Sequence, residues 1–346
     1  MQQWRIETPT SLEVEGVTRL EVRLVGGRIH VVGGVEASGA PQDVVPRQAF
    51  VEHAAPAALQ DVAPTQTFTE PAAPTQTFTE PAGPTQTFTE PAAPYASTID
   101  APAASGPLEG QPAGRIAGGR ARIEVTRLEG PLTVTLADGS LMISHERLTW
   151  AGILEWFGGR RTKADVSVSV PTNCPVRIGV VDAEAVVSGI DADTTAVKSV
   201  SGDVTLDGVR SGIVARTVSG DLETRRLAGD LEFSTVSGDL TVVQGTTSRL
   251  RAESVSGDLT LDLDLAPGGR LDVKTISGDL TLRLPGDAGL VVQVTTTSGS
   301  LDSAFGGVAT LKKPGQGTMS GQIGSGAGLL KAKSVSGDVT LLARSS

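Results

Sequence analysis

Residues 199–206 read S-V-S-G-D-V-T-L, and close variants of this octapeptide recur as far as residues 334–341. The seven copies are centred on Gly202, Gly220, Gly238, Gly257, Gly278, Gly299 and Gly337. Recurrence of a short strand-like motif is typical of chains that stack β units, each burying its apolar face on the next. The sequence therefore predicts an all-β fold, a β-solenoid of stacked short strands.

The composition fits such a stack. Aromatic residues make up 3% of the chain, whereas glycine numbers 42, so the core has to be built in thin layers of Val, Leu, Ile and Ala. The formal net charge is -10, which disfavours nucleic acid as a partner because phosphate binding draws on clustered Lys and Arg. The single cysteine, Cys174, excludes an intramolecular disulfide and a cysteine-based zinc cluster. We expect no cofactor.

The N-terminal sequence has neither a basic start nor an apolar stretch of signal-peptide length. No run of 18 apolar residues occurs anywhere in the chain, so an integral membrane protein is not expected. These features predict a cytoplasmic protein that is at most peripheral to a membrane.

Three regions follow from the sequence pattern. Residues 1–37 alternate polar and apolar side chains, as expected for N-terminal strands of the solenoid. Residues 38–120 are rich in Pro, Ala and Thr and contain A-P-T-Q-T-F-T-E-P-A nearly unchanged from Ala63, Ala73 and Gly83. Because proline lacks a backbone donor and few apolar residues remain, we predict a disordered insertion. Its threonines are interpreted as an unmodified spacer or as kinase targets. Residues 121–346 form the predicted solenoid repeat domain.

Positions within the repeat are counted from the glycine. The residue at +2 is Val or Leu in every copy, and the residue at -5 is mostly apolar, so both are predicted to point inward. The residue at -2 is Val or Ile in six copies and is assigned to the same inward ladder. This assignment requires a corner at -4 and -3, which hold mostly a basic residue followed by Ser or Thr.

The glycine is predicted either to lie where two walls approach too closely for a side chain, or to adopt a positive φ at a bend. Six copies carry aspartate at +1, which gives the structural pairs Gly202 and Asp203, Gly220 and Asp221, Gly238 and Asp239, Gly257 and Asp258, Gly278 and Asp279, Gly337 and Asp338. Stacked carboxylates repel each other by roughly 0.9 kcal/mol per pair in water. Acceptance of hydrogen bonds from turn amides would offset this repulsion, and calcium is the alternative. We predict structural turns without metal.

Catalysis has no clear candidate in the sequence. The histidines are His30, His53 and His145, and no nucleophile, metal or phosphate-loop motif is present. The sequence therefore predicts a protein that is not an enzyme. Parallel β-helices include polysaccharide-cleaving enzymes with carboxylates on one wall, so a carbohydrate-binding or carbohydrate-cleaving β-helix is the competing class.

One segment outside the repeat combines aromatic and basic side chains. Its residues are Trp150, Trp156, Phe157, Arg160, Arg161 and Lys163. Such neighbours suit contact with a membrane-associated partner or an acidic lipid surface. A cap over the open end of the stack is the other interpretation.

Several motifs together resemble the Toastrack family, a β-strand-repeat family that also carries an adhesin label. They are the reiterated V-S-G-D-L-T-L, V-V-D-A-E-A-V-V-S-G-I at residues 180–190, L-T-V-V-Q-G from Leu240 and T-T-S-G-S-L from Thr296. The resemblance covers residues 1–37 and 121–346. It implies a single-stranded β-helix or β-roll, without proven biochemical activity, associated with bacterial envelope-stress systems of the phage-shock and Lia type.

From these features we expect a non-enzymatic interaction or scaffold module. Its expected partner is a protein, which the resemblance places near membrane components. An adhesin-like or carbohydrate-binding β-helix is the alternative.

Overall fold

The computed structural model describes residues 1–34, 118–145 and 162–344, and most of the predicted insertion at 38–120 lies outside them. Every regular element in the described residues is a β-strand, so the prediction of an all-β fold is confirmed. Within the same residues no helix is long and apolar enough to span a bilayer. The strands lie within residues 2–34, 119–145 and 163–344.

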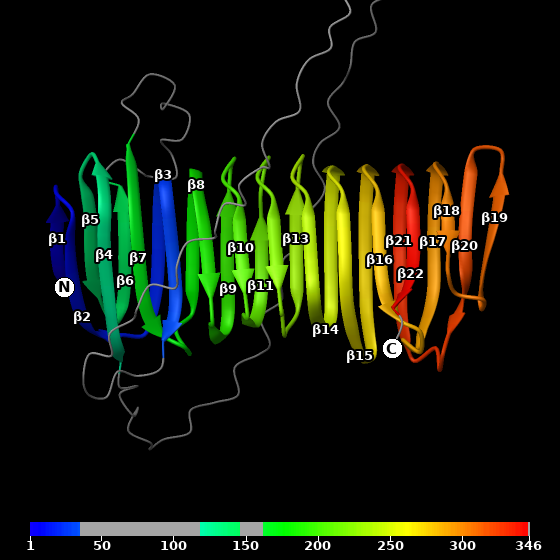
Figure 1. Cartoon of the computed structure of the whole chain (residues 1–346), viewed down its shortest axis with the longest axis horizontal. Coiled ribbons are helices and arrows are strands. Elements are labelled where there is room, and N and C mark those ends of the chain that lie inside the picture. Colours follow the sequence, from blue (N-terminus) through cyan, green and yellow to red (C-terminus); the bar gives the residue numbers. More distant parts are fainter. Residues whose placement is uncertain (35–117, 146–161, 345–346) are drawn as a thin grey trace, which may run out of the picture. The chain divides into compact units, whose positions relative to one another are not determined.

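The strands form two walls that share one hydrophobic core (Figure 1). Four long strands bend and take part in both walls: β3 (Arg19–Gly34), β8 (Val176–Ser188), β14 (Leu240–Ser256) and β15 (Leu259–Ser277). The first wall also contains β1 (Gln2–Ile6), β5 (Leu132–Ala137), β6 (Ser140–His145), β9 (Asp191–Ser199), β11 (Arg210–Arg216), β13 (Leu231–Thr235), β17 (Leu290–Ser298), β19 (Val308–Lys313), β20 (Gln316–Ile323) and β21 (Gly328–Ser336). The second wall also contains β2 (Thr10–Val17), β4 (Gly119–Glu129), β7 (Lys163–Pro171), β10 (Val204–Asp207), β12 (Leu222–Arg225), β16 (Leu280–Pro285), β18 (Leu301–Ser303) and β22 (Val339–Arg344).

From β8 to β16 the chain adds one strand to each wall per repeat, and each strand pairs in parallel with the equivalent strand of the next repeat. We call each such pair of strands a rung. The +2 residues are register partners in the second wall, as Leu222, Leu240 and Leu259 illustrate. The -5 residues, such as Phe233 and Ala252, are partners in the first wall. Their side chains are buried, so the inward placement of both positions is confirmed.

The corner of the repeat lies one step later than the sequence pattern indicated. Thr235, at -3, is 5% exposed, whereas Val236, at -2, is 49% exposed. The assignment of the -2 residues to the inward ladder is therefore wrong. Because the chain turns at -2 and -1, two successive residues face outward there. The alternation of inward and outward side chains then resumes, so that the glycine and the +2 residue face inward.

The corner glycines are required by contact between rungs. A Cβ atom on Gly238 would lie 2.1 Å from the backbone oxygen of Gly220, and the other copies repeat this approach. The steric conflict is thus with the carbonyl of the neighbouring rung, not with the opposite wall as one of the two predictions had it. The other prediction, a left-handed φ, holds for three of the seven copies, Gly278, Gly299 and Gly337.

Both ends of the stack depart from sequence order. Strand β3 pairs with β6 and β7 on one side and with β8 on the other. Strands β21 and β22 lie between β15–β16 and β17–β18, which Figure 1 shows as red strands among yellow and orange ones. Beyond these insertions the pairing becomes antiparallel. A strictly successive solenoid therefore describes the middle of the chain but not its ends.

His145 is buried at the end of β6. Its Nδ1 atom accepts a hydrogen bond from the backbone amide of Val25 at 3.1 Å. Its Nε2 atom has no hydrogen-bond partner in the described part of the chain. Burial lowers the pKa of the imidazole to about 4.

We expect mild acid to destabilise the fold through His145. The folded-state pKa of about 4 lies below the ordinary value of about 6.5, so the unfolded chain binds the proton more readily. Stability should therefore fall as the pH decreases from about 6.5 towards 4, by on the order of 3 kcal/mol in total. Urea unfolding at several pH values measures this loss. His145→Asn keeps an acceptor near Val25 and should flatten the profile; an unchanged profile would contradict the assignment.

Gly238→Ala should destabilise the protein by about 1–3 kcal/mol, because its methyl group would overlap the Gly220 carbonyl and force the rungs apart. Gly286→Ala is the matched control, since a Cβ atom at Gly286 meets nothing within 4 Å. Urea unfolding of both variants measures the difference. Equal stability of the two variants would show that the close approach of the glycines is unimportant.

Candidate functional site: an aliphatic ridge on the repeat corner

Serine at -1 links each corner to the one before it. The backbone amide of Ser219 donates to the carbonyl of Val200 at 2.9 Å, and its hydroxyl donates to the same oxygen at 3.2 Å. Ser237 makes the same pair of contacts with Val218, at 2.9 and 3.2 Å. The serines therefore belong to the stacking of the corner.

The aspartates at +1 form a second ladder. The Oδ1 atom of Asp221 accepts the amide of Asp239 at 2.9 Å, and Oδ1 of Asp239 accepts the amide of Asp258 at 2.8 Å. At the last rung the amide of Ser300 donates to Asp338 at 2.7 Å. These hydrogen bonds lower the pKa of the Asp338 carboxyl. These are the hydrogen bonds from backbone amides that the turn interpretation predicts.

Asp258→Ala should destabilise the fold by about 1 kcal/mol, because the amide of Asp279 loses the acceptor that it reaches at 2.8 Å. Asp258→Asn retains a side-chain oxygen and removes one charge from the acidic row, so its stability should equal or exceed that of the parent. Chemical unfolding of both variants tests this. A loss of the same size in the two variants would mean that the carboxylate charge, not the acceptor, holds the corner.

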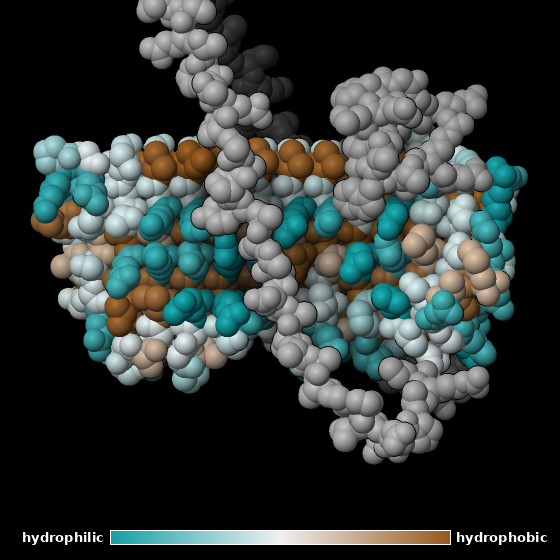
Figure 2. Space-filling view, turned by 180° about the vertical axis from the view of Figure 1, so that it is seen from behind, coloured by the Kyte–Doolittle hydropathy of each residue, from teal (hydrophilic) through white to brown (hydrophobic). Residues whose placement is uncertain are grey.

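The outward residues at -2 form a row along the corner, which we call the aliphatic ridge. Its members are Val200, Val218, Val236, Val255, Ile276 and Val335, each 37 to 52% exposed. Six of the nine large hydrophobic side chains that are exposed in the described residues belong to this row. Successive rungs are about 4.8 Å apart, so the ridge is about 24 Å long. Figure 2 shows a hydrophobic band along one edge of the molecule.

The fold does not require an aliphatic side chain at this position. In the copy around Gly299 the equivalent residue is Thr297, which is exposed and lies in β17, just as Val255, Ile276 and Val335 lie in β14, β15 and β21. A polar β-branched residue is thus compatible with the corner. Contiguous exposed apolar surface on a charged protein usually marks an interaction site.

Charged residues border the ridge on both sides. The aspartates at +1 lie on one side and are exposed. The -4 positions on the other side hold mainly cations, namely Lys198, Arg216, Lys274 and Lys333. Glu253 departs from this pattern and is bound by Lys274 at 2.9 Å and by Arg251 at 2.8 Å. The ridge therefore runs between an acidic row and a predominantly basic one.

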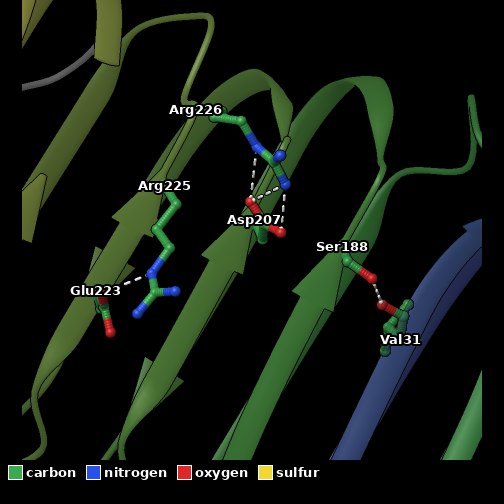
Figure 3. A network of polar contacts seen from close by, with 6 residues as sticks. All are labelled: Val31, Ser188, Asp207, Glu223, Arg225 and Arg226. Atoms are coloured by element: carbon green, nitrogen blue, oxygen red, sulfur yellow. Dashed lines mark hydrogen bonds and ion pairs between the residues drawn. The ribbon is translucent and has the colours of Figure 1, made fainter. Parts of the chain in front are cut away.

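At the far end of the second-wall strands a different contact joins the rungs (Figure 3). Both the Nε and the Nη2 atoms of Arg226 donate to the Asp207 carboxylate, at 2.6 to 3.1 Å. Arg225 donates to Glu223 at 2.7 Å along the same strand. These charges satisfy one another, so this corner has a structural role.

The structure brings the six predicted Gly–Asp pairs together in one corner. Trp150, Trp156, Phe157, Arg160 and Arg161 lie outside the described residues. Lys163 begins β7, which β3 and β8 separate from the first rung of the ridge. The -2 position of the ridge residues was recognised as apolar from the sequence but was predicted to face inward. The regular Ser or Thr at -3, with the glycine on the inward side, is the signal that could have located the corner correctly.

The fold and this corner define a class of β-strand-repeat protein in which V-S-G-D copies stack along one edge. The chain belongs to the family described as Toastrack DUF4097, whose model matches residues 165–342, just over half of the sequence. The family resemblance is thereby confirmed.

One solved structure, described as "a putative cell adhesion protein" from Clostridium sporogenes, aligns with 97% of this chain and 100% of its own. The identity is 8% and the TM-score 0.26, so this likeness carries no argument. No curated protein matches the sequence.

Proposed function

We propose that this protein is a non-enzymatic interaction module that binds a protein partner along the aliphatic ridge. The observation that carries the proposal is the concentration of exposed aliphatic side chains in one row, at a position that accepts threonine elsewhere in the repeat. An apolar strip with charged borders has the arrangement of a protein interface, which combines an apolar centre with a polar rim.

A protein partner fits this surface better than a carbohydrate does. The aromatic residues in the described part of the chain are Trp4, Phe233 and Phe305, and each is buried or half-buried. The ridge instead offers branched aliphatic side chains, which gain binding energy by excluding water from an equally apolar surface. The aspartates beside it are already engaged in hydrogen bonds between rungs, which supports a structural role for them over a catalytic one.

The cellular setting is also part of the proposal. Family membership supports a role as a scaffold in a bacterial envelope-stress response, acting from the cytoplasmic side on a membrane-associated protein. The alternative is an adhesin-like module, in which the same ridge would contact a surface protein.

Photo-crosslinking tests the ridge directly. A photoreactive amino acid at Val236 should give a discrete protein adduct in cells, and Val218→Asp with Val255→Asp should abolish it. The same photoreactive residue at Leu342, which is 39% exposed and lies in the second wall, should give no such adduct. Exposed substitutions of this kind change stability by about 0.5 kcal/mol or less, which urea unfolding can verify. Identical adducts at both positions, or none at Val236, would refute the proposal.

A further inference from the structure

A hollow of 610 Å³ opens on the outer face of the first wall, beside the first members of the ridge. Strands β3, β8, β9 and β11 line it, and Val200 and Val218 of the ridge form one of its sides. Its volume falls within the range of roughly 300–1,000 Å³ that is usual for ligand sites. The hollow and the ridge are therefore one continuous surface.

The hollow exists because two outward positions carry little or no side chain. Gly179 in β8 lies between Arg23 and Lys198 as register partners, and Ala196 lies opposite Arg177. A Cβ atom on Gly179 would come no closer than 3.9 Å to its neighbours, and no left-handed φ occurs there. Unlike the corner glycines, Gly179 is not required by packing, although glycine within a strand costs about 0.5–1 kcal/mol relative to alanine. Its effect is to keep this surface open.

Positive charge predominates around the hollow. Four cationic side chains line it, Arg23, Arg177, Lys198 and Arg216. The carboxylate in its lining, Glu21, is bound by Arg23 at 2.8 Å. Arg216 is 3.6 Å from Glu232 in an exposed pair, which binds weakly. Arg177 makes no ion pair with any described carboxylate. A basic hollow thus stands out on a chain whose net charge is -10.

A second hollow, of 520 Å³, shows that a predominance of positive charge is not a general property of the outer faces. It is lined by Arg28, His30, Asp165 and Glu184 among others. Arg28 is paired there with Glu184 at 2.9 Å. Carboxylates outnumber guanidinium groups in that lining, so the basic hollow differs in the ligand that it would attract.

We propose that the basic hollow receives an acidic side chain of the partner protein, from a segment whose adjacent aliphatic residues continue onto the ridge. This inference rests on the proposed function and specifies the partner's chemistry. Guanidinium groups bind carboxylates through paired, charge-assisted hydrogen bonds. The valines beside them exclude water from the contact, which strengthens it. The segment recognised therefore combines Asp or Glu with Val, Ile or Leu.

Fluorescence anisotropy with a labelled hexapeptide of alternating Val and Glu tests the proposal, using the full chain. We expect this peptide to bind at least tenfold more tightly than its Val and Gln counterpart, with an affinity that falls as salt increases. Gly179→Leu, which fills the hollow, and Arg177→Gln should each weaken binding at least tenfold. Arg122→Gln, at an exposed position in β4, should have no effect. Urea unfolding establishes that Gly179→Leu remains folded.

The outcomes separate this inference from the proposed function. Equal binding of the two peptides, or full binding by Gly179→Leu, would overturn the basic hollow as the acidic subsite. If Val236→Ser still weakened binding in that case, the ridge would remain the interaction surface. Binding to anionic phospholipid vesicles without binding to either peptide would identify a lipid surface as the occupant and would also overturn the proposal.

Discussion

The close approach of the glycine backbones at the repeat corner is the constraint on which the rest of the structure depends. The carbonyl oxygen of Gly220 lies only 2.1 Å from the position that the Cβ atom of any other residue at position 238 would take. With the backbones this close, the serine amide reaches the preceding carbonyl and the aspartate amide reaches the preceding carboxylate. The S-G-D triplet thus acts as one structural unit. Glycine permits the close approach of the backbones, and serine and aspartate form the hydrogen bonds that this approach allows.

Much of this architecture could be predicted from the sequence because the repeat reports it directly. The aliphatic residues at +2 and the small or apolar residues at -5 lie inward, as Leu240 and Ala252 illustrate. The corner was misplaced because Val236 is as apolar as a core residue, and hydrophobicity alone does not distinguish a core side chain from one kept for binding. The inserted position of β21–β22 could not be predicted, since near-identical copies give no local signal of which neighbour they join. That of β3 could not be predicted because its partners β6, β7 and β8 come from far later in the sequence.

Part of the candidate site could likewise be predicted from the sequence, and part could not. The Gly and Asp positions were identifiable because a strict pattern marks a strict requirement. The basic hollow was not, because it arises where Gly179 of β8 lies between Lys198 of β9 and Arg23 of β3, and Arg23 comes from a distant part of the sequence. The ridge occupies the one corner position that faces outward and makes no side-chain contact that stacking requires. Such a position is free to change from rung to rung. A row of six aliphatic residues there therefore indicates a binding surface, which the many aliphatic residues inside do not.

The rung formed by β21 and β22, which lies out of sequence order, affects how the protein folds during synthesis. During synthesis β17 and β18 leave the ribosome before β21 and β22, yet in the finished stack the later pair separates them from β15 and β16. The nascent chain must therefore hold this place open, or give up a premature pairing between similar copies, before its final register is reached. Until then it presents open sheet edges, which are prone to pairing with other chains. Slow maturation and reliance on chaperones are the expected cost of completing the stack with strands that are synthesised later than their neighbours.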